Sequence, residues 1–189
     1  MKILLTGFLA LISVNLMAQS KIRFSSQNYI TLLQGERGSF FGVQTINGLK
    51  YKTWFTGLGT GVDWYYQRSI PVFLSLNEDI PAKGSRNFFI ATRVGVNCPW
   101  QKTGYYDEWG YKLLVVLPRL YWEAGLGYRI GIGKSKKALL LELDFSEKYS
   151  RENVQYISFA PLLLLPQPLE NNHIDYRLRR LSLKAGWSF

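Results

Sequence analysis

The C-terminal stretch, residues 181–189, alternates without interruption between apolar side chains and small or polar ones. Successive side chains of an extended strand point to opposite faces, so this stretch would have one apolar and one polar face. The apolar face would carry Leu181, Leu183, Ala185, Trp187 and Phe189, and the polar face Ser182, Lys184, Gly186 and Ser188. This pattern suits either an edge strand of a soluble sheet or a strand of a membrane barrel, and the rest of the chain has to distinguish the two.

The same alternation recurs in five clear segments, at 54–66, 72–77, 88–97, 122–132 and 139–146, and more weakly at 26–34 and 39–47. Together with 181–189 these make eight predicted strands. A tilted strand of roughly 9–11 residues can cross a bilayer, and closure leaves no unpaired backbone facing lipid. The predicted fold class is all-β: an eight-stranded, antiparallel, up-and-down transmembrane β-barrel.

A soluble eight-stranded barrel of the lipocalin kind is the chief alternative. Such a barrel keeps its apolar face inside, around a ligand, and its charges outside. Here the charges share a face with the glycines, which suits a narrow and crowded interior. The opposite face of the five clear segments and of 181–189 carries no charge. A water-facing surface of that kind would cause aggregation, so we prefer the membrane interpretation.

Residues 1–18 are predicted to be a cleavable signal-peptide helix. Lys2 precedes an apolar run at 3–14, which is shorter than the roughly 20 residues of a spanning helix, and cleavage is expected after Ala18. Residues 19–189 would then form one barrel domain.

A single cysteine, Cys98, excludes an internal disulfide and a cysteine-based metal site. No cofactor or metal is expected.

The predicted location is the outer membrane of a Gram-negative bacterium, with both termini in the periplasm. The turns at 47–53, 81–87 and 133–137 would then be periplasmic, and the connections at 35–38, 67–70, 98–119 and 147–177 would lie outside. Aromatic rings prefer the membrane interface. This topology predicts two girdles: Trp64, Tyr66, Tyr121 and Trp122 at the outer rim, and Tyr51, Trp54, Trp187 and Phe189 at the periplasmic rim.

The chain has a net charge of +10, and much of the excess falls in the predicted periplasmic turns. These turns contain no acidic residue but carry Lys50, Lys52, Lys83, Arg86, Lys134, Lys136 and Lys137. Two interpretations stay open: contact with anionic lipid headgroups, or a solvated basic rim. Nucleic acid is not an expected partner, because the basic residues form no continuous groove and the chain is predicted to be exported.

The inward faces of the predicted strands carry both signs of charge, at Asp63, Arg93, Glu123, Arg129, Glu142, Asp144 and Lys184. The interior of an eight-stranded barrel is just wide enough for side chains to fill, so these residues are expected to form an ionic network. Strand adjacency favours Lys184 with Glu142 or Asp144, and Arg129 with Glu142. A narrow polar pore or a proton-linked site is the functional alternative to this structural role.

The chain offers no catalytic motif, and it is not expected to be an enzyme. The only histidine, His173, lies in a predicted outer connection with no serine beside it, so a serine–histidine arrangement has no support in the sequence.

The last predicted outer connection contains a group of apolar residues: Phe159, and between Pro161 and Pro166 the run Leu162, Leu163, Leu164 and Leu165. These residues are a candidate docking loop for a partner protein in the outer membrane or for outer-leaflet lipid. The alternative is that the run extends a strand or packs across the barrel mouth.

The chain resembles the small outer-membrane β-barrels, a family that includes the OmpA transmembrane domain, the OmpX-like proteins and the PorT-like proteins. The resemblance rests on the order and spacing of degenerate motifs, GLGTGV at 57–62, IPVFLSL at 70–76, AGLGY at 124–128 and LKAGWSF at 183–189. It implies contact with outer-membrane lipid, and recognition of the C-terminal strand with its final aromatic residue by the barrel-assembly machinery.

The resemblance implies no specific activity, and two classes of function stay open. The first is a structural or interaction barrel, including an accessory subunit of a secretion or assembly complex. The second is a small pore or a lipid-processing enzyme, which would include lipid A acyltransferases and deacylases.

Overall fold

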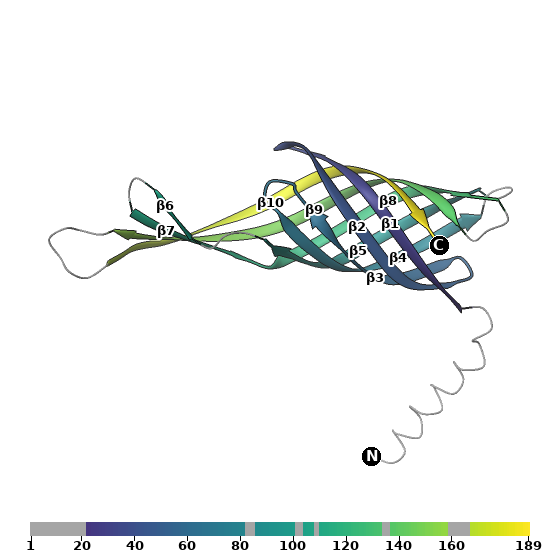
Figure 1. Cartoon of the computed structure of the whole chain (residues 1–189), viewed down its shortest axis with the longest axis horizontal. Coiled ribbons are helices and arrows are strands. Elements are labelled where there is room, and N and C mark those ends of the chain that lie inside the picture. The colour runs from purple at the N-terminus through teal and green to yellow at the C-terminus, as the bar shows by residue number, and fades with distance from the viewer. Residues whose placement is uncertain (1–21, 82–85, 101–103, 108–109, 134–136, 159–166) are drawn as a thin grey trace, which may run out of the picture.

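A computed structural model describes residues 22–81, 86–100, 104–107, 110–133, 137–158 and 167–189 (Figure 1). The predicted signal peptide lies outside these residues. Eight strands form one antiparallel barrel: β1 (Ile22–Gly35), β2 (Gly38–Tyr51), β3 (Trp54–Asp63), β4 (Ser69–Pro81), β5 (Arg86–Pro99), β8 (Arg119–Gly131), β9 (Ala138–Ser158) and β10 (Gln167–Ser188). The predicted fold class is confirmed.

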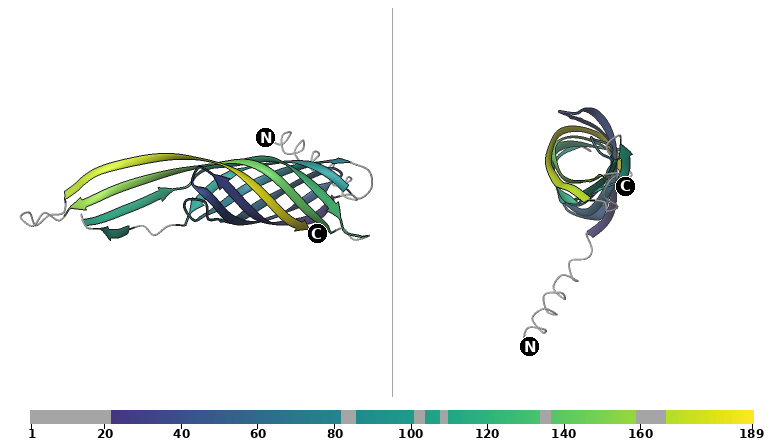
Figure 2. Two further views of the ribbon diagram at one scale, coloured as in Figure 1. Left: turned by 90° about the horizontal axis from the view of Figure 1, so that it is seen from above. Right: turned by 90° about the vertical axis from the view of Figure 1, so that its left-hand side faces the viewer.

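The barrel closes where β10 pairs with β1, from Ser188 opposite Gln27 to Arg180 opposite Gly35. The pairing continues to the last residue, because the backbone N–H groups of Ser26 and Phe189 each donate to the other's carbonyl oxygen, at 2.9 and 3.1 Å. The right-hand view of Figure 2, along the long axis, shows the strands wrapped around the interior. We call the end that holds Phe189 the C-terminal rim and the opposite end the far rim.

The outward face of the wall is the apolar one. Leu58, Leu126 and Leu143 are 65%, 66% and 59% exposed, whereas Arg93 and Lys184 are 2% and 0% exposed. A lipocalin-like barrel would show the reverse arrangement, so the soluble alternative is excluded. Among the described residues, no helix is long and apolar enough to cross a membrane.

Two strands run well beyond the barrel at the far rim. The pairing of β1 with β10 stops at Arg180, but β9 and β10 stay paired as far as Ser158 and Gln167. Two short strands, β6 (Gly104–Asp107) and β7 (Gly110–Leu117), form a hairpin, and β7 pairs with β9. We call β6, β7 and residues 147–158 and 167–179 the β-extension; it projects from the barrel in Figures 1 and 2.

The β-extension corrects the predicted outer connections. Most of 98–119 and 147–177 is strand rather than loop. The alternation that marks the barrel strands fades there, because beyond the apolar wall both faces of a sheet can carry polar residues. The sequence SEKYSREN at 146–153 has no apolar face to reveal its period.

Aromatic rings fill much of the interior, and glycines on neighbouring strands make room for them. Phe73 and Phe89 are buried in one cluster with Tyr29, Ile46, Phe55, Ala91, Tyr121 and Leu140. A Cβ atom at Gly59 would lie 2.2 Å from the ring of Phe73, and one at Gly127 would lie 2.1 Å from the ring of Phe89. The glycine rows in the sequence therefore reflect close packing inside the barrel.

Replacing Gly127 with leucine should destabilise the barrel by about 1–3 kcal/mol, because the new side chain would overlap the buried Phe89 ring. The free energy of unfolding can be measured by urea denaturation in lipid vesicles. Ala185→Leu, on the exposed outward face of β10, is the control and should change stability little. Equal effects of the two substitutions would contradict this packing arrangement.

Candidate functional site

The ionisable side chains inside the barrel form three tiers along its axis. In the far tier Asp63 on β3 contacts Arg180 on β10, and Lys148 on β9 lies 3.7 Å from the same carboxylate. In the C-terminal tier Asp79 contacts Lys50 and lies 3.4 Å from Arg129. Between them lies the middle tier, formed by Arg93, Lys184, Glu123, Glu142 and Asp144.

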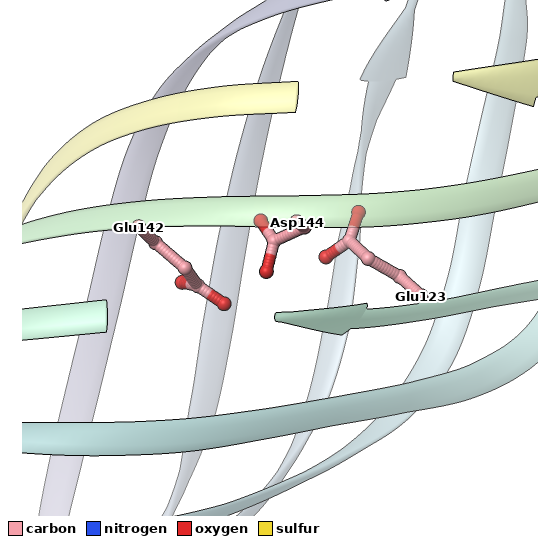
Figure 3. Close-up of side chains that lie close together, drawn as sticks. All are labelled: Glu123, Glu142 and Asp144. Atoms are coloured by element: carbon pink, nitrogen blue, oxygen red, sulfur yellow. The ribbon is translucent and has the colours of Figure 1, made fainter. Parts of the chain in front are cut away.

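The middle tier gathers three carboxylates, from Glu123 on β8 and from Glu142 and Asp144 on β9 (Figure 3). One carboxylate oxygen from each of the three residues lies within 4.8 Å of the other two. Arg93 contacts Glu123 and lies 2.7 Å from Glu142, while Lys184 contacts Glu123 and lies 3.2 Å from Asp144. Carboxylates so grouped could ligate a cation, but here two protein cations already contact them.

Neutral groups complete the middle tier. The hydroxyl of Tyr121 donates to Glu123 at 2.7 Å, and Lys184 donates to the side-chain oxygen of Gln44 at 3.0 Å. The guanidinium of Arg93 lies 5.5 Å from the centre of the Tyr29 ring. Buried charges are tolerated when they are paired and hydrogen-bonded. All five charged groups of this tier have an oppositely charged partner, and the tier draws on β1, β2, β5, β8, β9 and β10. Among the described residues, Arg93 Nε, Glu142 Oε1 and Asp144 Oδ1 have no hydrogen-bond partner.

The connection between β3 and β4 folds into the far mouth of the barrel. Tyr65 is fully buried there, and its backbone N–H donates to Asp63 at 2.7 Å. Lys148 donates to the carbonyl oxygens of Tyr65 and Gln67 and to the hydroxyl of Ser69, at 3.1, 3.0 and 2.7 Å. The Tyr65 ring packs with Leu33 and Leu178, with Phe40, Tyr66 and Tyr176 beside them. The far mouth is therefore filled by side chains.

The structure places all seven predicted network residues in the interior, each 8% exposed or less. Of the predicted pairings, Lys184 with Asp144 is present. The pairing of Arg129 with Glu142 is wrong, because Arg129 contacts Asp79 instead. The strand register explains this: Glu142 lies opposite Gly127, so Arg129 sits nearer the C-terminal rim.

Sequence reasoning missed four buried or half-buried members of the network: Lys50, Asp79, Lys148 and Arg180. Lys50 lies in the predicted turn at 47–53. The other three continue an inward alternation past the predicted ends of their strands, through Ser75, Asn77 and Asp79, through Asp144, Ser146 and Lys148, and through Lys184, Ser182 and Arg180. Extending the period of two beyond the apolar residues would have found them.

Most of the predicted girdle residues lie on the outward surface. Tyr51, Trp54, Trp64, Trp187 and Phe189 are exposed, and Trp122 is half-buried with its ring 5.7 Å from that of Phe145. Tyr66 is half-buried against Tyr176, with the rings 5.3 Å apart. The assignment of Tyr121 is wrong, because it is 1% exposed and lies inside. Adjacent residues of one strand face opposite sides, so Tyr121 and Trp122 cannot both point outward.

Three other predicted features have different outcomes. The candidate docking residues Phe159 and Leu162–Leu165 lie outside the described residues, as do Lys83, Lys134 and Lys136. His173 is exposed on β10 within the β-extension. Within the described part of the chain, no hydrogen bond of its side chain to a serine or a carboxylate is found.

The sequence matches no family model and no curated protein. Among solved structures, the barrel is similar to the outer membrane protein AlkL, determined by solid-state NMR in DMPC lipid bilayers. The two share 11% identity over 89% of this chain and 90% of that chain, with a TM-score of 0.50. The chain has the fold of the small outer-membrane β-barrels. The crystal structure of Neisserial surface protein A (NspA) also matches, at 10% identity over 88% of this chain and 95% of that chain, with a TM-score of 0.48.

Replacing Arg93 with alanine should destabilise the barrel by about 3–5 kcal/mol, because three buried carboxylates would then share one cation. Urea unfolding in vesicles measures the loss. Arg86→Ala, at the exposed start of the same strand, should change stability by less than about 0.5 kcal/mol.

A second substitution, Glu142→Gln, should restore part of the stability lost in Arg93→Ala, since it removes one unpaired charge. The network would have no role in stability if Arg93→Ala and Arg86→Ala unfolded at the same urea concentration.

Proposed function

We propose that the protein is an integral barrel of the outer membrane of a Gram-negative bacterium and that it has a structural or interaction role. Export through the predicted signal peptide and a periplasmic C-terminal rim are part of this proposal. One observation carries it: the interior is filled by paired charges and aromatic rings, while a long sheet projects from the far rim. The barrel anchors, and the β-extension is the part that meets a partner.

The filled interior favours this role over that of a pore. Three tiers of ion pairs, the ring cluster around Phe73 and Phe89, and the inward-folded Tyr65 together occupy the interior. An eight-stranded barrel is just wide enough for its own side chains. Water and ions would need these groups to separate, at the cost of unpaired buried charges.

The β-extension supplies backbone groups for a partner. Residues 180–188 of β10 lie between β1 and β9, whereas residues 167–179 pair with β9 alone within the described part of the chain. An unpaired strand edge can accept a further strand from another chain. This edge supports the more specific proposal of an accessory subunit in a secretion or assembly complex.

The proposal assigns no catalytic role to the barrel. Small barrels that process lipid use histidine with serine and an acid, and the exposed position of His173 offers no such arrangement among the described residues.

The purified barrel should show no discrete conductance steps in planar lipid bilayers, because its interior is occupied along its length. The recording should include the double variant Tyr65→Ala/Arg180→Ala, which removes the two groups that fill the far mouth. A resolved open state in the unmodified protein would contradict the interaction role and support the alternative, a small pore.

A photo-crosslinking residue placed at His173, exposed in the β-extension, should give a discrete adduct with a second protein in outer-membrane fractions. The same residue at Lys52, exposed at the C-terminal rim, is the matched control. Equal labelling at the two positions, or none at His173, would remove the support for the β-extension as the contact surface.

A further inference from the structure

The apolar wall of the barrel ends abruptly at one rung of β9 and β10. Phe145 and Leu181 lie opposite each other and are 38% and 54% exposed on the outward face. The next outward pair is Glu147 opposite Arg179, and the one after that is Tyr149 opposite Arg177. Because the register continues without a shift, these polar residues lie on the same outward face as the apolar wall and directly beyond it.

Glu147 connects the side chains of the first two polar pairs, those of Glu147 with Arg179 and of Tyr149 with Arg177. Although it faces outward, it is only 3% exposed. Its carboxylate accepts hydrogen bonds from Arg177 at 3.1 and 3.0 Å and from Arg179 at 3.1 Å. Trp122 and Tyr149 donate to it at 3.2 and 3.0 Å. One buried acid therefore fixes two arginines and two aromatic rings in one outward cluster.

The two arginines remain available to a ligand. Their side chains are 52% and 54% exposed, although both contact Glu147. A guanidinium has five N–H donors in a rigid plane. The hydrogen bonds to Glu147 use two nitrogen atoms of Arg177 and one of Arg179, so each guanidinium keeps N–H donors that are not bonded to the acid.

A hollow lies at the next outward pair, beyond Tyr149 and Arg177. Arg151 and Asp175 form a two-pronged ion pair there, with both N–O distances 2.6 Å. The hollow has a volume of about 300 Å³ and is lined by Arg119, Tyr149, Ser150, Arg151, Asp175, Tyr176 and Arg177. With Arg179 beside it, the cluster and the hollow contain four arginines and two acids, Glu147 and Asp175, so the surface has an excess of positive charge.

The position of the cluster relates it to a membrane interface. Residues 181–189, at the end of β10 and just beyond it, carry the outward apolar side chains, and a tilted strand of roughly 9–11 residues crosses the hydrocarbon core. Trp122 and Tyr149 lie at the edge of this span, where amphipathic rings are favoured. If the C-terminal rim is periplasmic, as proposed above, the arginines lie at the level of the outer-leaflet headgroups.

We propose that Arg177 and Arg179, with Arg119 and Arg151 around the hollow, bind the phosphate of a phosphorylated glycolipid headgroup in the outer leaflet. Arginine pairs with phosphate through parallel N–H donors, which gives both strength and orientation. The exposed side chains of Leu143, Phe145, Leu181 and Leu183 lie directly below, where the acyl chains of such a lipid would pack. This inference rests on the proposed membrane orientation but not on the interaction role.

The test uses the full barrel in nanodiscs of phosphatidylcholine, titrated with diphosphorylated lipid A, with dephosphorylated lipid A and with inorganic phosphate. Native mass spectrometry counts the bound molecules. The unmodified protein should bind the phosphorylated lipid roughly tenfold or more tightly than the dephosphorylated one, since each arginine at the interface adds to the attraction. In Arg177→Gln/Arg179→Gln this preference should fall to about twofold or less.

Two further variants control for folding and for net charge. The double variant leaves Glu147 buried without its cations, so a third substitution, Glu147→Gln, is added in a parallel variant, which should lose the preference equally. Arg37→Gln/Arg68→Gln removes the same number of charges from exposed positions on far-rim connections and should retain the preference.

The proposal is overturned if the cluster variants keep the preference, if the control variant loses it equally, or if inorganic phosphate binds as well as the phosphorylated lipid. The last result would mean an anion site without lipid specificity. These results are separable from those of the conductance and crosslinking experiments, because a closed barrel with a partner could still fail to bind phosphorylated lipid.

Discussion

The hydrogen bonds between β10 and β1 join the two ends of the described chain and turn an open sheet into a closed wall. A strand edge in hydrocarbon would leave backbone N–H and C=O groups without partners, each costing several kcal/mol. Pairing from Gln27 with Ser188 to Gly35 with Arg180, continued by Ser26 and Phe189, removes that cost along the barrel. Only with the wall closed can Leu183, Trp187 and their neighbours face an apolar medium.

Closure also creates an interior that side chains must fill. Ion pairing and the packing of rings against glycines determine which side chains fill it. Arg180 joins β10 to Asp63 on β3, and Arg93 joins β5 to carboxylates on β8 and β9. These pairs connect strands that are far apart in sequence, so they add cross-links through the barrel to the hydrogen bonds around it. Glycines such as Gly127 provide the space that Phe89 and the other rings occupy.

The β-extension and the outward arginine cluster share the same two strands. Since β9 and β10 stay paired from the barrel wall to Ser158 and Gln167, with one register shift between Pro168 and Glu170, the rung of Glu147 and Arg179 continues the apolar rungs beneath it. A lipid bound at this rung would lie against the base of the β-extension. The proposed partner surface and the proposed lipid site are therefore adjacent on one continuous pair of strands.

The sequence by itself determined the number of barrel strands, their inward and outward faces and the ionic character of the interior. An alternation of apolar and polar residues is present wherever one face of a strand must be apolar. The sequence could not determine which charges pair. Arg129 meets Asp79 rather than Glu142 because the register between β8 and β9 sets the tiers, and register depends on the whole closed sheet. It also missed the β-extension, where neither face is required to be apolar. Only the tertiary structure brought Glu147 on β9 into contact with Arg177 and Arg179 on β10, since the pairing of the two strands determines which of their residues meet.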